Sequence, residues 1–105
     1  MPLVVPLVPE TAAQSVTVRA PIRHLCPFKE EVDDGHITVV FRVCTSTFEM
    51  HALADYLGSF AAERISHESL TDRIYTELSQ QHGPVVERVS TEWETAGAQV
   101  LVTRA

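Results

Sequence analysis

His36-Ile37-Thr38-Val39-Val40-Phe41-Arg42-Val43-Cys44 is the stretch from which the fold can be predicted. Apolar side chains recur at every second position of it, at Ile37, Val39, Phe41 and Val43. Alternation with a period of two predicts a β-strand with one buried face. The segments on either side should therefore supply further strands and a layer that covers this apolar face.

A shorter strand and a long loop precede this stretch. Alternating valine and polar residues predict a strand from Ser15 to about Ala20, and Pro21 is expected to end it. The loop then runs from Ile22 to Gly35 and finishes in the turn-forming sequence Val32-Asp33-Asp34-Gly35.

Two helices are expected after the central strand. Ser46 and Glu49 have the three-residue spacing of a capping box. They predict a first helix from about Phe48 to Arg64, because apolar residues then recur at helical spacing. Ser66 can cap a second helix, which Gly83 and Pro84 stop.

Two strands are expected at the end of the chain. The first runs from Val85 to Glu94, with Val85, Val89 and Trp93 on its apolar face. Thr95-Ala96-Gly97 turns the chain, and residues 98–103 return as the second strand of a hairpin.

The order strand, strand, helix, helix, strand, strand predicts an α+β domain with a four-stranded antiparallel sheet. Two helices between the second and third strands would pack on one face and make two layers. A sheet this short has two open edges, which pairing with another copy or closure into a barrel would satisfy. We therefore expect a homo-oligomer, with an active site shared between subunits.

Composition indicates one globular domain of residues 15–105, preceded by an extended arm of residues 1–14. The chain has 105 residues, a formal net charge of −6 and two cysteines. Two cysteines are too few for a disulfide framework, so a reducing cytoplasm is the expected location, with a Cys26–Cys44 bridge as the open alternative. The acidic balance argues against a broad basic face for nucleic acid, but Arg19, Arg23, His24 and Lys29 can form a local patch.

Cys26 is the first candidate for chemistry. Cations next to a thiol favour the thiolate, which is the attacking form, and this cysteine lies within the basic cluster. Asp33 follows seven residues later and can pass a proton to whatever the sulfur attacks, provided that the fold brings the two together. Alternatively, Cys26 is a small buried apolar residue and Asp33 a turn residue.

Several short motifs of this chain, at fixed distances from one another, resemble those of the QueF family of nitrile reductases, which reduce 7-cyano-7-deazaguanine in queuosine biosynthesis. That family has Leu-Cys-Pro with an acid seven residues after the cysteine, as in Leu25-Cys26-Pro27 with Asp33. It also has a helix-opening glutamate, a Ser-Phe pair ten residues later and a His-Glu pair eight residues after that serine. Glu49, Ser59-Phe60 and His67-Glu68 repeat these offsets, and Trp93 with Gly97 repeats the family's closing hairpin. The resemblance covers about residues 17–103 and implies the tunnelling fold, in which sheets close into a barrel and two rings usually stack.

The helix that carries the NADPH motif of the reductases differs in this chain. Both lysines and the arginine of that motif are absent between Glu49 and Ala62, and Asp55 is added. A dinucleotide with a 2′-phosphate needs cationic or N–H partners, so no cofactor is expected. The pattern resembles the QueF-like branch, which adds ammonia to the same nitrile in archaeal tRNA and forms the amidine of archaeosine.

The resemblance implies a role for each site residue. Cys26 would form a covalent thioimide, with Asp33 and His67 moving protons. Glu68 would bind the guanine-like edge of the base through two adjacent N–H donors, and Glu49 and Ser59 would make further base-side or intersubunit contacts. Modified tRNA and ammonia are the implied partners, and Arg19 to Lys29 would contact the tRNA.

Other interpretations of these residues stay open. Glu49 can be only a capping acid, Glu68 can complement the positive end of a helix, and His67 can be a surface histidine. No Cys-x-x-Cys or His-x-x-x-His spacing is present, so no metal site is predicted. The alternative functions are an NADPH-dependent reductase of the free base and a non-catalytic nucleobase-binding protein.

Overall fold

The central strand of the structure is β3 (Val32–Val43), which lies between two long neighbours. A computed structural model describes residues 1–7 and 12–105. β3 pairs antiparallel with β2 (Gln14–Leu25) and with β5 (Val85–Thr95), and β6 (Ala98–Arg104) completes a sheet of order β2-β3-β5-β6. The predicted four-stranded antiparallel sheet is confirmed.

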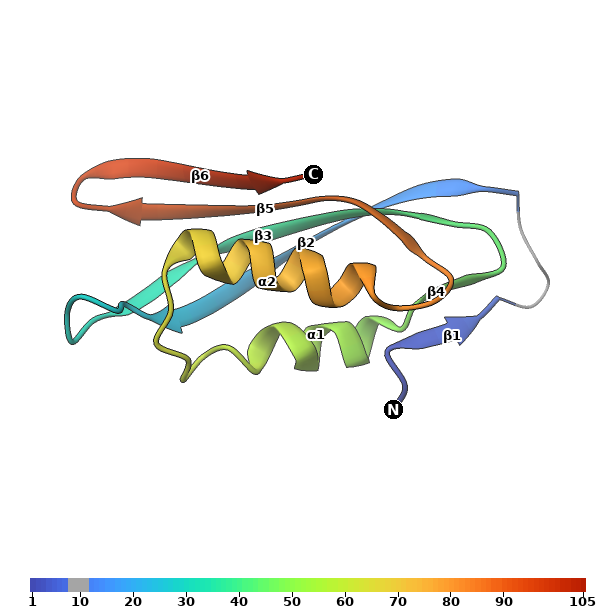
Figure 1. Cartoon of the computed structure of the whole chain (residues 1–105), viewed down its shortest axis with the longest axis horizontal. Helices are drawn as coiled ribbons and strands as arrows, with labels where there is room; N and C mark the ends of the chain where they lie inside the picture. The colour runs from blue at the N-terminus through green and yellow to red at the C-terminus, as the bar shows by residue number, and fades with distance from the viewer. Residues whose placement is uncertain (8–11) are drawn as a thin grey trace.

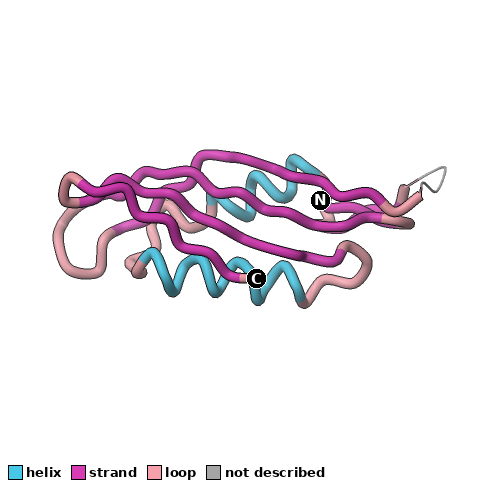
Figure 2. Tube along the Cα trace, turned by 90° about the horizontal axis from the view of Figure 1, so that it is seen from above, coloured by secondary structure: helices cyan, strands magenta, loops and turns pink. Residues whose placement is uncertain are grey.

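Both helices cover one face of this sheet, as Figures 1 and 2 show from two sides. They are α1 (Met50–Gly58) and α2 (His67–Ser79). The hydroxyl of Tyr56 in α1 donates a 2.6 Å hydrogen bond to Glu77 in α2, and burial raises the pKa of this phenol. The domain measures 48 × 24 × 19 Å, and no helix in the described residues is long and apolar enough to cross a membrane.

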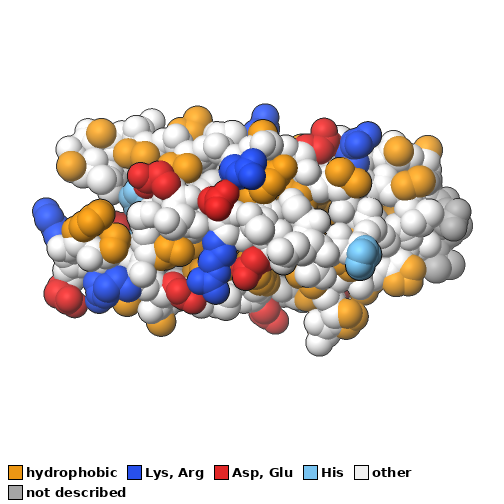
Figure 3. Space-filling view, in the orientation of Figure 1, with side chains coloured by type: hydrophobic (Ala, Val, Ile, Leu, Met, Phe, Trp, Pro, Cys, Tyr) orange, Lys and Arg blue, Asp and Glu red, His pale blue; other side chains and the backbone are white. Residues whose placement is uncertain are grey.

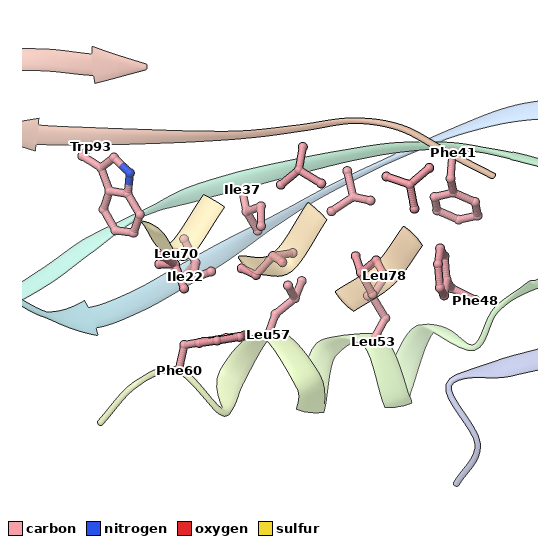
Figure 4. Close-up of a cluster of buried hydrophobic side chains, with 14 of the residues drawn as sticks. Ile22, Ile37, Phe41, Phe48, Leu53, Leu57, Phe60, Leu70, Leu78 and Trp93 are labelled. Atoms are coloured by element: carbon pink, nitrogen blue, oxygen red, sulfur yellow. The ribbon is translucent and has the colours of Figure 1, made fainter. Parts of the chain in front are cut away.

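The core lies between the sheet and the helices (Figure 4). The four apolar residues of the central strand, Ile37, Val39, Phe41 and Val43, are all buried, as their alternation predicts. The covering side chains come from the helices and from the segments beside them, namely Phe48, Leu53, Leu57, Phe60, Leu70, Ile74 and Leu78. Burial of this apolar layer is the main force that holds the helices on the sheet.

The predicted end of the first strand at Pro21 is wrong. β2 continues through Pro21, which pairs with His36, and ends at Leu25. Because β2 is an edge strand, it tolerates a residue without an N–H group. The predicted turn at Val32–Gly35 is also wrong, because these residues pair with the end of β2. The loop therefore shortens to residues 26–31.

The first helix is shorter than predicted. It begins at Met50 and ends at Gly58 rather than spanning residues 48–64. The predicted capping box is also wrong, because Ser46 lies in a strand and Glu49 is itself the N-cap, accepting the Ala52 N–H at 2.6 Å. Ser66 caps the second helix as predicted, through the Ser69 N–H.

A bulge in the sheet changes which valine of β5 is buried. The register shifts between Val40 and Phe41, so that Phe41 pairs with Val86. Val86 is therefore buried, whereas Val85, which the alternation predicted for the core, is exposed. The β5–β6 hairpin turns through Ala96 and Gly97, which both have positive φ, so the predicted hairpin is confirmed.

The N-terminal segment contributes a second, smaller sheet. β1 (Val4–Pro6) pairs antiparallel with β4 (Ser46–Phe48), and Leu3, Val4 and Leu7 pack against the core. These residues of the predicted 1–14 arm are therefore extended and docked. The part of the arm at residues 8–11 lies outside the described residues.

Candidate active site

One cavity gathers four of the predicted site residues at one end of the sheet. It has a volume of about 940 Å³ and lies between the 26–31 loop, the start of α2 and the β5–β6 turn. Its lining includes Cys26, Asp33, His67 and Glu68. Figure 3 shows this end as a notch at the left of the molecule.

The loop that carries Cys26 is held by hydrogen bonds at its start and in its middle. Leu25 N–H donates to Glu63 O at 2.8 Å, and Ile65 N–H donates to Leu25 O at 3.1 Å. The guanidinium of Arg64 donates to Cys26 O at 2.6 Å and to Lys29 O at 3.2 Å. These contacts tie the loop to the segment that joins the two helices.

The thiol of Cys26 is partly buried at the edge of the cavity, and this cysteine is not disulfide-bonded. The backbone N–H of Phe28 points at its sulfur at 3.4 Å. The side chain of Phe28 itself is 86% exposed at the rim of the same cavity.

Asp33 reaches the cavity from β3, where it pairs with His24 of β2. Its carboxylate Oδ2 lies 3.7 Å from His24 Nε2, and its side chain is mostly buried. The structure therefore places this acid in the strand rather than in a loop, on the same cavity as the sulfur.

His67 and Glu68 enter the cavity from the first turn of α2, which Ser66 caps. Glu68 is exposed to solvent there. Burial lowers the pKa of His67, and the neighbouring His24 ring lowers it further, while Asp33 and Glu68 act in the opposite direction. His67 is consequently a neutral imidazole at pH 7.

Three contacts hold His67, two of them through its imidazole ring. Its ring stacks on Trp93 with centroids 4.4 Å apart, and its Nδ1 lies 2.8 Å from His24 Nε2. Its backbone carbonyl accepts a 2.7 Å hydrogen bond from the Thr71 hydroxyl. The predicted core position of Trp93 is confirmed, since this residue is 3% exposed.

A buried polar chain links these supports. Trp93 Nε1–H donates to Thr91 Oγ1 at 2.9 Å, and the hydroxyls of Thr91 and Thr71 are 2.6 Å apart. Thr71 uses its proton on the His67 carbonyl, so it accepts from Thr91. Each donor in the chain thus has one acceptor, and the network is fully satisfied.

Glu49 and Ser59 lie away from this cavity, at opposite ends of α1. Glu49 caps the helix and also accepts a 2.8 Å bond from His51, and these hydrogen bonds lower the pKa of its carboxyl. Ser59 donates to Tyr56 O at 2.6 Å. In a single subunit both therefore have local structural partners, and an intersubunit role for them stays a prediction.

The predicted basic patch is only partly formed. His24 is fully buried, so it cannot belong to a surface patch. Arg19 pairs with Glu92 at 3.1 Å and Arg23 with Asp34 at 2.6 Å, which offsets both charges. Lys29 remains on the loop beside Cys26, at the cavity.

One group of described residues, His24, Asp33 and His67, has the donor types for a metal ion, with ligand atoms within 4.8 Å of one another. The two histidine nitrogens are 2.8 Å apart, which is a hydrogen-bond distance. Two nitrogens on one tetrahedral zinc would be about 3.3 Å apart, given bonds of about 2.0 Å. The observed arrangement therefore fits a hydrogen-bonded pair better than a metal centre.

Sequence reasoning missed four of the supporting residues: His24 as a ring partner, Arg64, Thr71 and Thr91. The signal that could have found His24 and Thr91 is their position on the inward face of a strand. His24 follows Ile22 by two, and Thr91 lies between Val89 and Trp93. A polar residue on an apolar face needs a hydrogen-bond partner.

Comparison with known proteins identifies the family. A model of the QueF-like protein family matches residues 33–105. The chain belongs to the QueF-like protein family. The match begins at Asp33, includes His67 and Glu68, and starts after Cys26.

Two cyanobacterial relatives of this QueF-like chain are each named NADPH-dependent 7-cyano-7-deazaguanine reductase. The protein of Prochlorococcus marinus (strain MIT 9301) is 29% identical over 56% of this chain and 43% of its own length. That of Parasynechococcus marenigrum (strain WH8102) is 27% identical over 75% of this chain and 59% of its own length. The chain thus spans about half the length of the curated relatives it matches.

A crystal structure of the archaeosine synthase QueF-Like in the apo form has the same fold. It superposes with a TM-score of 0.80 and 18% identity, over 86% of this chain and 90% of that one. The predicted tunnelling-fold subunit is therefore confirmed, and its oligomeric assembly stays a prediction.

Proposed function

We propose that this QueF-like chain converts the nitrile of 7-cyano-7-deazaguanine in tRNA to the amidine of archaeosine. The observation that carries the proposal is the shared cavity of Cys26, Asp33, His67 and Glu68. Its volume of about 940 Å³ is within the range of small-molecule sites and accommodates a modified base. The proposed enzyme acts in the cytoplasm as a homo-oligomer that pairs through the open edges of β2 and β6.

The first step joins the substrate to the protein. The Cys26 thiolate adds to the nitrile carbon and forms a C–S bond, while the nitrile nitrogen takes a proton from Asp33. The product is a thioimide, and the oxidation state of the sulfur is unchanged. Glu68 holds the base during this step, because its carboxylate can accept from the ring N–H and the exocyclic amine together.

The second step uses ammonia and returns the sulfur. Ammonia adds to the thioimide carbon, a base removes one of its protons, and the C–S bond breaks to release the thiolate. The sum is nitrile plus ammonia to amidine, so no reductant is needed. His67 is the proposed base, because its imidazole is neutral and lies at the cavity.

The residues of α1 do not fit the cofactor of the reductases. Between Met50 and Ala62 the helix and its following turn carry no lysine or arginine, and Asp55 adds a negative charge. A 2′-phosphate would find no cation on this segment. The names of the cyanobacterial relatives nevertheless make reduction by NADPH the second candidate function.

Intact-mass spectrometry tests the proposal. Mixing the protein with the free nitrile base should add the full mass of the base to the native chain and to Cys44→Ala, but not to Cys26→Ala. Addition of ammonium should then release the base from Cys26 as the amidine. With ammonium, tRNA that carries the nitrile should be converted to tRNA that carries the amidine. Loss of reduced nicotinamide on addition of NADPH would indicate the reductase instead. Binding without any adduct on the native chain would indicate a non-catalytic protein.

A further inference from the structure

His24 is a buried side chain that the proposed reaction does not use directly. It is 0% exposed and lies on the inward face of β2. Its ring packs in a T-shaped arrangement with the Trp93 ring, with centroids 4.7 Å apart and planes at 89°. Both of its nitrogens have partners: Leu25 O at 3.0 Å from Nδ1 and His67 Nδ1 at 2.8 Å from Nε2.

The directions of these two hydrogen bonds follow from the chemistry of the partners. A carbonyl oxygen only accepts, so His24 Nδ1 must carry a proton. In its neutral form, His24 with a proton on Nδ1 has a bare Nε2. That nitrogen accepts, so the proton in the 2.8 Å contact belongs to His67 Nδ1.

The tautomer of His67 is thereby fixed. With its proton on Nδ1, the neutral His67 ring has a bare Nε2. In the part of the chain that the structure describes, no hydrogen bond engages this atom, and no buried side-chain nitrogen or oxygen lacks a partner. The His67 Nε2 is therefore not buried, and His67 is one of the residues that line the cavity.

Of the described neighbours of His67, His24 is the one that decides the tautomer of the His67 ring. Trp93 stacks on the face of the His67 ring and restricts its tilt, but it offers no acceptor to Nδ1. Thr71 binds only the backbone carbonyl. The Asp33 carboxylate lies 3.7 Å from His24 Nε2, which is too far for a hydrogen bond to that nitrogen.

We propose that His24 is a positioning residue, which holds His67 in the tautomer whose bare Nε2 takes a proton from the attacking ammonia. The proposal rests on the proposed function for the identity of the attacking group. In that step the ammonia nitrogen forms a bond to the thioimide carbon, and one N–H bond breaks as its proton moves to His67 Nε2. The C–S bond then breaks and returns the electron pair to Cys26. The opposite tautomer would present an N–H group to the ammonia and could not accept the proton.

Nitrogen NMR of the protein without substrate tests the tautomer. In protein labelled with ¹⁵N-histidine, protonated and bare ring nitrogens have well-separated shifts, and His67 is assigned by its loss in His67→Gln. We expect a protonated Nδ1 and a bare Nε2 on His67. A protonated Nε2, or a bound metal ion that replaces the contact with His24, overturns the proposal whatever the activity of the protein.

Two substitutions of His24 test the kinetic role. His24→Phe keeps the ring against Trp93 but removes the acceptor, and His24→Gln keeps an amide oxygen that can accept the same N–H. We expect His24→Phe to slow discharge of the thioimide by ammonia on the order of a hundredfold, with adduct formation retained. His24→Gln should restore most of the rate. Equal slowing of both steps, or equal defects in both variants, contradicts a tautomer effect.

These outcomes are separable from failure of the proposed function. If the native chain forms no adduct, the reaction is wrong, but the NMR result still decides whether His24 fixes His67. If the adduct forms and discharges normally in His24→Phe, the reaction stands and the positioning role is wrong. Should His24→Phe not fold, the NMR measurement on the native chain and the kinetics of His24→Gln decide.

Discussion

The imidazole of His67 stacks on the indole of Trp93, with ring centroids 4.4 Å apart and ring planes 12° apart. Trp93 in turn lies on Gly35, its pairing partner in β3. A Cβ atom on Gly35 would be 2.5 Å from the Trp93 ring and would also overlap Glu92 O. The absence of a side chain at residue 35 therefore allows the indole to sit flat on the sheet, where it supports the histidine.

Gly35→Ala should destabilise the domain and displace the support of His67. The added methyl group meets a backbone oxygen and a packed ring, and overpacking of this kind costs about 1–3 kcal/mol. Urea unfolding measures the loss. The fluorescence of Trp93, the single tryptophan, reports displacement of the ring.

Gly58→Ala is the matched control for that change. It is the last residue of α1, and a Cβ there meets nothing within 4 Å. Alanine is the better helix former, so this variant should be stabilised by up to about 1 kcal/mol. A Gly35→Ala protein as stable as the parent would show that the sheet yields to the methyl group.

Thr91→Val should cost about 1–3 kcal/mol, because it leaves the buried Trp93 N–H without an acceptor. Valine has nearly the same shape, so the loss reports the hydrogen bond rather than a cavity. Thermal unfolding gives the free-energy change. Thr103→Val, which removes an exposed 3.2 Å contact with Ser90, should change stability by less than about 0.5 kcal/mol. Similar losses in both variants would mean that the buried hydrogen bonds contribute no more to stability than the exposed one.

Local patterns in the sequence predict most of the fold. The alternation of the central strand, the cap at Ser66 and the glycine of the hairpin turn each depend on neighbours within a few residues, and the structure confirms all three. The wrong predictions have non-local causes. Asp33, Asp34 and Gly35 favour turns in isolation, but pairing with β2 draws them into a strand.

The candidate site is less accessible to sequence reasoning. The residues of the cavity could be grouped only by family resemblance, since the sequence contains no signal that joins Cys26 to His67. The supports of His67 are harder still, because His24 and His67 are 43 positions apart and Thr71 and Thr91 are 20 apart. Single polar residues on apolar faces indicate that a partner exists, but not which residue it is.

The stability of the domain should fall as the pH drops below about 6.5, in part because of His67. Burial lowers the pKa of His67 from 6.5 in the folded state, so the unfolded chain binds more protons in the interval between the two values. Folding is then opposed by protonation, and stability rises with pH across this interval. Chemical unfolding at several pH values should show a smaller slope for His67→Gln than for the parent.

Comparison of His67→Gln with the parent separates the pH dependence due to His67 from the pH dependence due to the Glu49–His51 pair. The hydrogen bond between those residues raises the pKa of His51 and therefore contributes stability that is lost as the pH rises. Both proteins contain this pair, so it cancels in the difference. An equal slope in parent and His67→Gln would contradict the assignment, and His82→Gln serves as the control for loss of an exposed histidine.

Phe28→Ala should weaken binding of tRNA that carries the nitrile. An aromatic ring that is 86% exposed beside the cavity offers a surface on which a base can stack, and such contacts are worth about 1–3 kcal/mol each. Filter binding at fixed salt measures the change. Val85→Ala removes an exposed apolar side chain of the inner strand β5, away from this cavity, and should bind normally. Equal affinity of both variants would exclude a stacking role for Phe28.

Arg64→Met should slow attack by Cys26 while the core stays intact. Arg64 is the side chain that joins the 26–31 loop to the segment between the helices, through the carbonyls of Cys26 and Lys29. Methionine keeps an unbranched apolar stem but removes both of these hydrogen bonds and the 3.4 Å contact with Glu30, so the loop should exchange its amide hydrogens faster and the adduct should form more slowly. Arg42→Met, which loses only a 3.8 Å surface contact with Glu87, controls for the charge. If hydrogen exchange in the loop rises but the rate of adduct formation does not fall, the position of the sulfur is set by Leu25 and the strand rather than by Arg64.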